Sequence, residues 1–175
     1  MTESIFVRPV TRDDRAEFLD LMRASRSLHE PWISPPLTER AFDAYLTRTH
    51  RSDHEGLLVC RRDAPAIVGV INLNNIVRGS FLNASLGYYA GATFAGKGYM
   101  TVGLKAAIRF AFDDLGLHRL EANIQPANTP SINLVKRCAF EKEGFSARFL
   151  YIAGAWRDHE RWAIYHHRDT LGRAN

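Results

Sequence analysis

A glycine-rich turn is the part of the 175-residue sequence whose composition suggests chemistry most directly. A strand-like segment at residues 86–90 is followed by Ala95-Gly96-Lys97-Gly98-Tyr99-Met100 and then by a helical pattern. Glycines leave backbone N–H groups accessible, and a helix N-terminus adds unpaired donors and the positive end of the helix dipole. The turn could therefore cradle an anion such as a phosphate. It has neither the P-loop nor the GxGxxG pattern, and taken alone a tight connection explains it equally well.

The elements around this turn follow from periodicity and capping. After the turn, apolar residues recur at helical spacing from Leu104 to Leu115, and Gly116 stands where a C-cap glycine ends a helix. Before it, we expect a strand at 6–9, a helix capped by Thr11 with Asp14 as the capping-box acid, a proline-rich loop at 28–36, and a helix capped by Thr38. Three β-like runs, at 56–62, 66–76 and 81–90, are joined by links too short for helical crossovers, which predicts an antiparallel meander.

The last third of the chain predicts two further pairs of elements. Residues 118–125 alternate between apolar and polar as a half-buried strand does, and Thr129-Pro130 resembles a helix start with proline at its first position. Two final strands, at 144–153 and 161–166, are joined through Gly154 in a hairpin. The order β-α-α-β-β-β-α-β-α-β-β predicts an α+β fold, in a single domain over 1–175.

Composition excludes several classes of protein. Apolar residues make up 46% and charged residues 24% of the chain, as in globular domains. No run reaches the roughly 18 apolar residues of a membrane helix, and no signal peptide is visible, so we expect a cytoplasmic protein without membrane association. The net charge of +4 is dispersed, which disfavours nucleic acid as a partner. Cys60 and Cys138 are expected to be buried structural thiols, and the histidine spacings indicate no metal site.

Taken together and in order, seven segments resemble the GNAT acetyltransferases, and within them the RimJ/RimL-type N-acetyltransferases. The segments are Val7-Arg8-Pro9; the loop at 28–32; Leu86-Gly87-Tyr88-Tyr89; the run from Gly96 to Thr101; His118-Arg119-Leu120-Glu121-Ala122; Asn128-Thr129-Pro130-Ser131; and the run from Phe140 to Phe145. The resemblance implies a mixed, mostly antiparallel sheet splayed in a V, with flanking helices and acetyl-CoA in the opening. It implies no metal.

The resemblance also implies which residues hold the cofactor. The pyrophosphate would lie on the backbone N–H groups around the glycine-rich turn, and the pantetheine arm along the strand that ends at Ala90. Asn128 and Ser131 would face the thiol end. The implied cofactor-binding set is Tyr89, Ala90, Ala95, Gly96, Lys97, Gly98, Tyr99, Met100, Asn128 and Ser131.

Three positions depart from the family pattern. Ala95 replaces the usual Gln or Arg, which removes a side-chain phosphate contact and could lower the affinity for CoA. Ala139 replaces the glycine of a Gly-Phe pair. Val135 stands where many members have a tyrosine acid; the RimJ/RimL type is similar in lacking it, and offers Ser131 instead.

Acetyl transfer needs a neutral amine, donors for the oxyanion and a weak acid for the thiolate, but no covalent enzyme intermediate. Neither cysteine is therefore expected to be a nucleophile. Ser131 is the candidate acid, although it and Asn128 could also serve as helix caps. Glu121 is the first candidate base, acting through water from the face it shares with Asn123, with an ion pair to an arginine as the equal alternative. Asp158 is the second candidate, with a solvated turn acid as its alternative.

On the substrate side, Trp32 is a candidate wall or else an anchor of its loop, and His29 a weaker candidate. Tyr88 and Tyr89 alternate across their strand, so at most one side chain faces the cleft.

The predicted acceptor is the N-terminal α-amine of a protein or peptide. The alternatives are a small amine such as a polyamine, an aminoglycoside or a toxin-like peptide, a non-catalytic acyl-CoA-binding module, and, on the arginine excess alone, a nucleic-acid-binding module. The sequence leaves a homodimer open, since second-half strands could pair across one.

Overall fold

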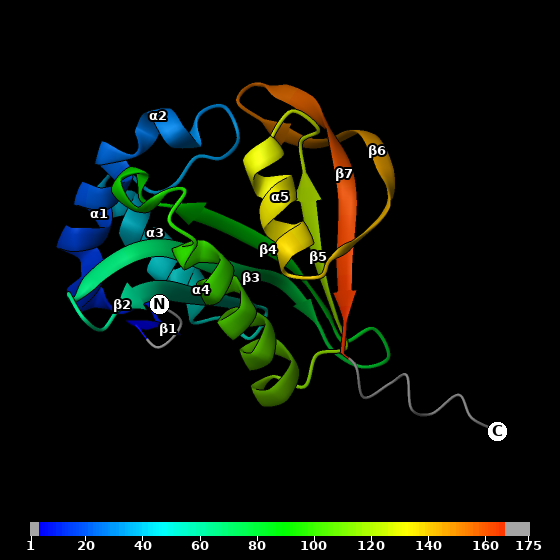
Figure 1. The fold of residues 1–175 in the computed structure, drawn as a ribbon, viewed down its shortest axis with the longest axis horizontal. Helices are drawn as coiled ribbons and strands as arrows, with labels where there is room; N and C mark the ends of the chain where they lie inside the picture. The colour runs from blue at the N-terminus through cyan, green and yellow to red at the C-terminus, as the bar shows by residue number, and fades with distance from the viewer. Residues whose placement is uncertain (1–3, 167–175) are drawn as a thin grey trace.

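In the computed structural model, which describes residues 4–166, seven strands form one open sheet in the order β1-β2-β3-β4-β5-β7-β6 (Figure 1). The predicted domain over 1–175 thus extends at both ends past the described residues. The strands are β1 (Ile5–Pro9), β2 (His54–Arg61), β3 (Ala66–Val77), β4 (Asn83–Ala90), β5 (Arg119–Ile124), β6 (Glu141–Ile152) and β7 (Ala155–Tyr165). The helices are α1 (Arg15–Ala24), α2 (Arg26–His29), α3 (Glu39–Thr49), α4 (Tyr99–Arg109) and α5 (Thr129–Arg137).

The sheet opens between β4 and β5, and this opening creates the V shape. Strands β1 to β4 pair antiparallel in sequence order, which confirms the predicted meander. Strands β4 and β5 run parallel, and their pairing stops after Leu86 and Ala122. The rest of β4 has no ladder with β5, so the two halves of the sheet diverge there, as Figure 1 shows between the end of β4 and the tip of β5. The α+β GNAT architecture expected from the sequence is confirmed.

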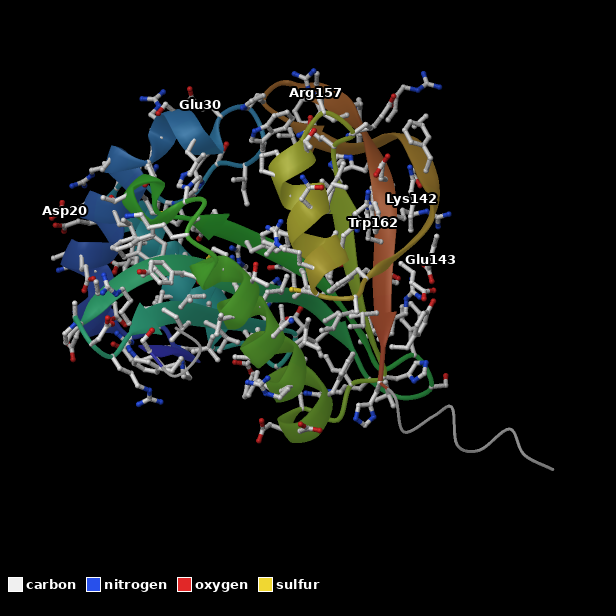
Figure 2. The ribbon with its side chains drawn as sticks, viewed as in Figure 1. Asp20, Glu30, Lys142, Glu143, Arg157 and Trp162 are labelled. Atoms are coloured by element: carbon white, nitrogen blue, oxygen red, sulfur yellow. The ribbon has the colours of Figure 1, made fainter. Side chains whose placement is uncertain are left out.

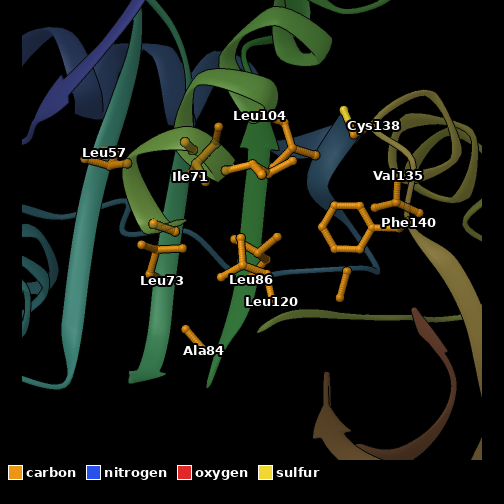
Figure 3. Packing of buried hydrophobic residues seen from close by; sticks show 14 of the residues in the cluster. Leu57, Ile71, Leu73, Ala84, Leu86, Leu104, Leu120, Val135, Cys138 and Phe140 are labelled. Carbon is orange, nitrogen blue, oxygen red and sulfur yellow. The ribbon is translucent and has the colours of Figure 1, made fainter. Parts of the chain in front are cut away.

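Two hydrophobic clusters form the core, and the larger one joins the two halves of the sheet. The larger cluster packs α4 and α5 against the strands, with Leu104, Leu120 and Val135 fully buried at its centre (Figure 3). The smaller one packs α1 and α3 against β2 and β3, with Phe18 and Phe42 edge-to-face at 5.1 Å. The predicted alternation in β5 is confirmed, since Leu120, Ala122 and Ile124 are all buried. Both cysteines are free and buried, as expected.

Several element boundaries differ from the predictions. The short helix α2 takes in Leu28 and His29, so the proline-rich loop begins only at Glu30. A 3₁₀ turn over Arg12–Asp14 separates Thr11 from α1; the capping box nevertheless forms, with the Asp14 carboxylate accepting the Thr11 N–H at 2.7 Å. In α5, Asn128 is the N-cap and Pro130 occupies the second position rather than the first.

The final hairpin is longer than predicted, and β7 begins at Ala155 rather than at residue 161. The reason is that the first residues of β7 extend past the end of β5 and pair only with the exposed edge strand β6, so residues 155–158 are not buried and show no apolar alternation. Register shifts between Lys142 and Gly144 and between Ser146 and Leu150 disturb the period further. Asp158 therefore lies within β7 and not in a turn.

Within residues 4–166, none of the helices is long and apolar enough to span a bilayer.

Candidate active site

A cavity of about 100 Å³ lies where β4 and β5 separate, with walls from four segments. Strand β4 contributes Leu86, Gly87 and Tyr88; β5 contributes Ala122, Asn123 and Ile124; α5 contributes Asn128 and Ser131; and the loop after α2 contributes Trp32 and Ile33. The polar groups of distant segments thus converge at the opening of the V. A larger hollow beside α1 lacks such convergence, because its Glu17 already accepts the Ile67 N–H at 2.6 Å.

A pair of hydroxyl groups stands in this cavity. The Ser131 Oγ and the Tyr88 hydroxyl oxygen are 2.7 Å apart, and either group can be the donor. Burial raises the pKa of Tyr88, so its hydroxyl stays protonated at neutral pH. Asn128 Oδ1 accepts the Ser131 N–H at 3.3 Å. The helix cap therefore uses only the backbone of Ser131, and the Ser131 hydroxyl is available to hydrogen-bond with Tyr88. A tyrosine hydroxyl therefore reaches the site from β4, although Val135 is fully buried in the core.

The glycine-rich turn has the geometry of an anion cradle. Gly96 and Gly98 have φ of 74° and 81°, and a Cβ atom at either would meet nothing within 4 Å. Gly98 is the N-cap of α4, and its carbonyl accepts the N–H groups of Thr101 and Val102. The N–H groups at the very start of α4 have no partner within the helix. No acidic residue occupies the first turn, and Lys97 is exposed, so the site suits a phosphate.

His29 lies against the end of β4 rather than in the cavity. It is only 4% exposed, its Nε2 is 2.8 Å from the Ala90 carbonyl oxygen, and its ring meets Tyr89 edge-on at 5.6 Å. Burial lowers the pKa of His29, so the ring is neutral and Nε2–H donates to Ala90. Ser25 Oγ accepts the Ala92 N–H at 2.8 Å beside it. The junction of α1 and α2 therefore clamps the segment that leads from β4 into the cradle.

Replacement of His29 by alanine should weaken acetyl-CoA binding severalfold and lower the free energy of unfolding by about 1–3 kcal/mol, because the buried Ala90 carbonyl loses its donor. His29→Gln, which keeps an N–H donor without a titratable ring, should recover most of both losses. Calorimetric titration with CoA and thermal unfolding test this. Equal CoA affinity in the alanine variant and the unchanged protein would contradict the prediction that His29 supports CoA binding by holding this segment in place.

The two candidate bases are held elsewhere. Glu121 pairs with Arg119 Nε at 2.9 Å, and Arg119 also binds Glu143 and lowers its pKa. The Asp158 carboxylate accepts the Arg148 N–H at 2.8 Å across a bulge of β6. Neither carboxylate lines the cavity. For Glu121 the geometry thus matches the ion-pair alternative.

The structure brings together Trp32, Tyr88, Asn128 and Ser131, as the sequence suggested, and places Tyr89 in the opposite core. Sequence reasoning missed Asn123, whose Oδ1 is buried without a hydrogen-bond partner among the described residues. The signal that could have identified Asn123 as a site residue was its position on the polar face of a strand with alternating polarity. Among residues 4–166 there is no group of three His, Cys, Asp or Glu side chains suited to a metal ion.

This fold is that of a family of acyl-CoA-dependent enzymes. The family described as "Acetyltransferase (GNAT) domain" matches residues 4–141, and the chain therefore belongs to the GNAT acetyltransferases. The activity of this family is acetyl transfer to amines, and relatives named as ribosomal-protein acetyltransferases of the RimJ/RimL type are among the proteins that the chain is similar to.

Three comparisons support this placement. The chain is 29% identical to the probable N-acetyltransferase YjcK of Bacillus subtilis over 93% of its own length and 94% of that protein. It is 45% identical to the ribosomal protein uS5-alanine N-acetyltransferase of Escherichia coli, over 58% of this chain and 53% of that one. Mycobacterium smegmatis RimJ in complex with CoA-disulfide superposes with a TM-score of 0.85 at 26% identity, covering 97% and 85% of the two chains. A spermidine N(1)-acetyltransferase of Vibrio cholerae is more distant, at 21% identity over 94% of both chains.

Proposed function

We propose that the chain transfers the acetyl group of acetyl-CoA directly to the N-terminal α-amine of a protein or peptide in a ternary complex. The observation that carries the proposal is the Ser131–Tyr88 hydroxyl pair in the cavity at the opening of the V. The cradle fits the pyrophosphate of CoA. Beyond Leu86, β4 has no partner on its β5 side, so the extended pantetheine arm can lie along it as an added strand.

In the proposed mechanism, Ser131 acts on the leaving group. The amine nitrogen bonds to the acetyl carbon as the carbon–sulfur bond breaks. Ser131 Oγ–H then protonates the departing thiolate, the Tyr88 hydroxyl passes its proton to Ser131, and water returns to Tyr88 the proton that the amine nitrogen loses. The buried Oδ1 of Asn123 accepts an N–H of the incoming amine and aims its lone pair at the cavity. The excess proton of the amine leaves to water, because no carboxylate lines the cavity.

The cavity's neutral walls favour an α-amine over a polyamine. A polyamine carries several ammonium groups, and burying these without opposite charge is costly. The ten residues that line the cavity include aromatic, aliphatic, amide and hydroxyl side chains but no carboxylate. A single amine that enters neutral needs only the amide and hydroxyl groups present. The acceptor is therefore proposed to be a peptide N-terminus, and a small amine is the second candidate.

A mass-spectrometric acetylation assay tests the acceptor. We expect a gain of one acetyl group on short peptides with free N-termini, and none on the same peptides with blocked N-termini, polyamines or aminoglycosides. Binding of desulfo-CoA reports that the protein is folded. Transfer to small amines alone would replace the proposal with metabolite or drug modification. Binding of CoA without transfer to any amine would point to a non-catalytic module.

A further inference from the structure

The strand next to the cavity carries unpaired positive charge on the cavity's side of the sheet. Asn123 of β5 lies opposite Arg161 of β7 in the ladder, so both side chains leave the same face. Residues alternate along β7, which puts Arg157 on that face as well. We call Arg157 and Arg161 the basic ledge.

Two acidic side chains of the hairpin already have cationic partners. Lys142 pairs with Glu160, and Glu143 is held by Arg119. Arg119 lowers the pKa of Glu143 most strongly, and Arg161 lowers it to a smaller extent. Within residues 4–166, no carboxylate lies within ion-pair distance of either ledge arginine, and Arg157 donates only to the Ile152 carbonyl at 3.4 Å.

The opposite wall of the opening adds no free negative charge. Glu30, at the end of α2, pairs with Arg26 at 2.7 Å. Figure 2 shows Glu30 and Arg157 on the two sides of the top of the opening, Glu30 beside α2 and Arg157 on the hairpin. The two ledge arginines therefore add positive charge at this side of the cavity, next to the network in which Glu121 and Glu143 share Arg119.

Gly144 fixes where the Arg161 charge lies. A Cβ atom at Gly144 would be 2.8 Å from Nη2 of Arg161, so the guanidinium lies against the bare backbone of β6. Strand β6 is two strands from β5, or about 10 Å from Asn123 at the usual strand spacing. An extended peptide covers that distance in about three residues, at roughly 3.3 Å each.

We propose that the basic ledge binds a carboxylate side chain at the third or fourth residue of the acceptor, so that the preferred substrate is a peptide with an acidic N-terminal segment. This inference rests on the proposed function, with the α-amine at Asn123. The chain's own charge of +4 is consistent with it, because an acidic partner is attracted and a basic one repelled.

The test compares kcat/KM for three peptide sets that differ only in Glu, Gln or Lys at the third and fourth residues. We expect Glu peptides to exceed Gln peptides by roughly three- to tenfold, the size that two exposed ion pairs provide, and Lys peptides to be poorest. Added NaCl should shrink the difference. In the variant R157Q/R161Q, the ratio of kcat/KM for Glu peptides to kcat/KM for Gln peptides should fall close to one. The value of kcat/KM for Gln peptides should be unchanged.

R40Q/R109Q is the matched control, since it also removes two exposed positive charges, one from α3 and one from the far end of α4, and should preserve the ratio. Equal rates on all three peptide sets, or a preference that survives R157Q/R161Q, would overturn the ledge while leaving α-amine acetylation intact. Acetylation of none of the peptides would instead remove the proposed function together with the ledge. Melting temperatures equal to that of the unchanged protein would show that the variants are folded, so that a change in peptide preference is not caused by misfolding.

Discussion

Ser131→Ala should lower kcat tenfold or more while leaving the KM for acetyl-CoA within about twofold, the size of effect expected from loss of a general acid. The Ser131 Oγ stands 2.7 Å from the Tyr88 hydroxyl in the cavity, where a departing thiolate would need a proton. The substitution spares the helix cap, because Asn128 bonds to the backbone N–H of residue 131. The melting temperature should therefore stay close to that of the unchanged protein, and steady-state kinetics over a range of pH measures the effect.

Tyr88→Phe is the companion variant, since it removes the second hydroxyl and keeps the ring. A relay through Ser131 predicts a smaller loss of kcat in Tyr88→Phe than in Ser131→Ala. The reverse order would assign the proton to Tyr88, whose burial keeps it protonated. An unchanged kcat in Ser131→Ala would remove Ser131 from the acid role.

Gly98→Val should raise the KM for acetyl-CoA tenfold or more with little change in the KM for the acceptor. The residue caps α4 at φ 81°, which a β-branched side chain tolerates poorly. Relief of this strain would rotate the adjoining peptide groups, and the N–H groups at the start of α4 would no longer converge on the pyrophosphate. Isothermal titration with CoA and steady-state kinetics measure the loss.

Gly116→Val provides the matched control. Gly116 lies beyond the other end of the same helical segment at φ 66°, and a Cβ atom there also meets nothing within 4 Å. Both variants should lose about 1–3 kcal/mol of stability to backbone strain. Only Gly98→Val should lose CoA affinity. Equal CoA affinity in the two variants would refute the proposal that the glycine-rich turn binds the pyrophosphate of CoA.

Local signals determined the order and type of the elements. The capping box of Thr11 and Asp14, the cap at Thr38 and the glycine at 116 each act over a few residues, so they can be read along the chain. The alternation of β5 predicted its buried face for the same reason. Strand β7 was predicted too short because its first residues pair only with the exposed edge strand β6 and lack this periodic burial. The cradle, a run of neighbouring residues, was likewise visible in the sequence.

The tertiary structure alone decided which side chains meet. Tyr88 and Ser131 are 43 residues apart and touch only because β4 and β5 stop pairing after Leu86 and Ala122. Glu121 resembled a base by its position, yet the hairpin brings Glu143 to Arg119, and the three charges form one network. His29 resembled a loop residue until α2 placed it against Ala90. Local periodicity fixes which face a residue occupies, whereas its partner depends on strand order, register and the point where the sheet opens, which are long-range properties of the fold.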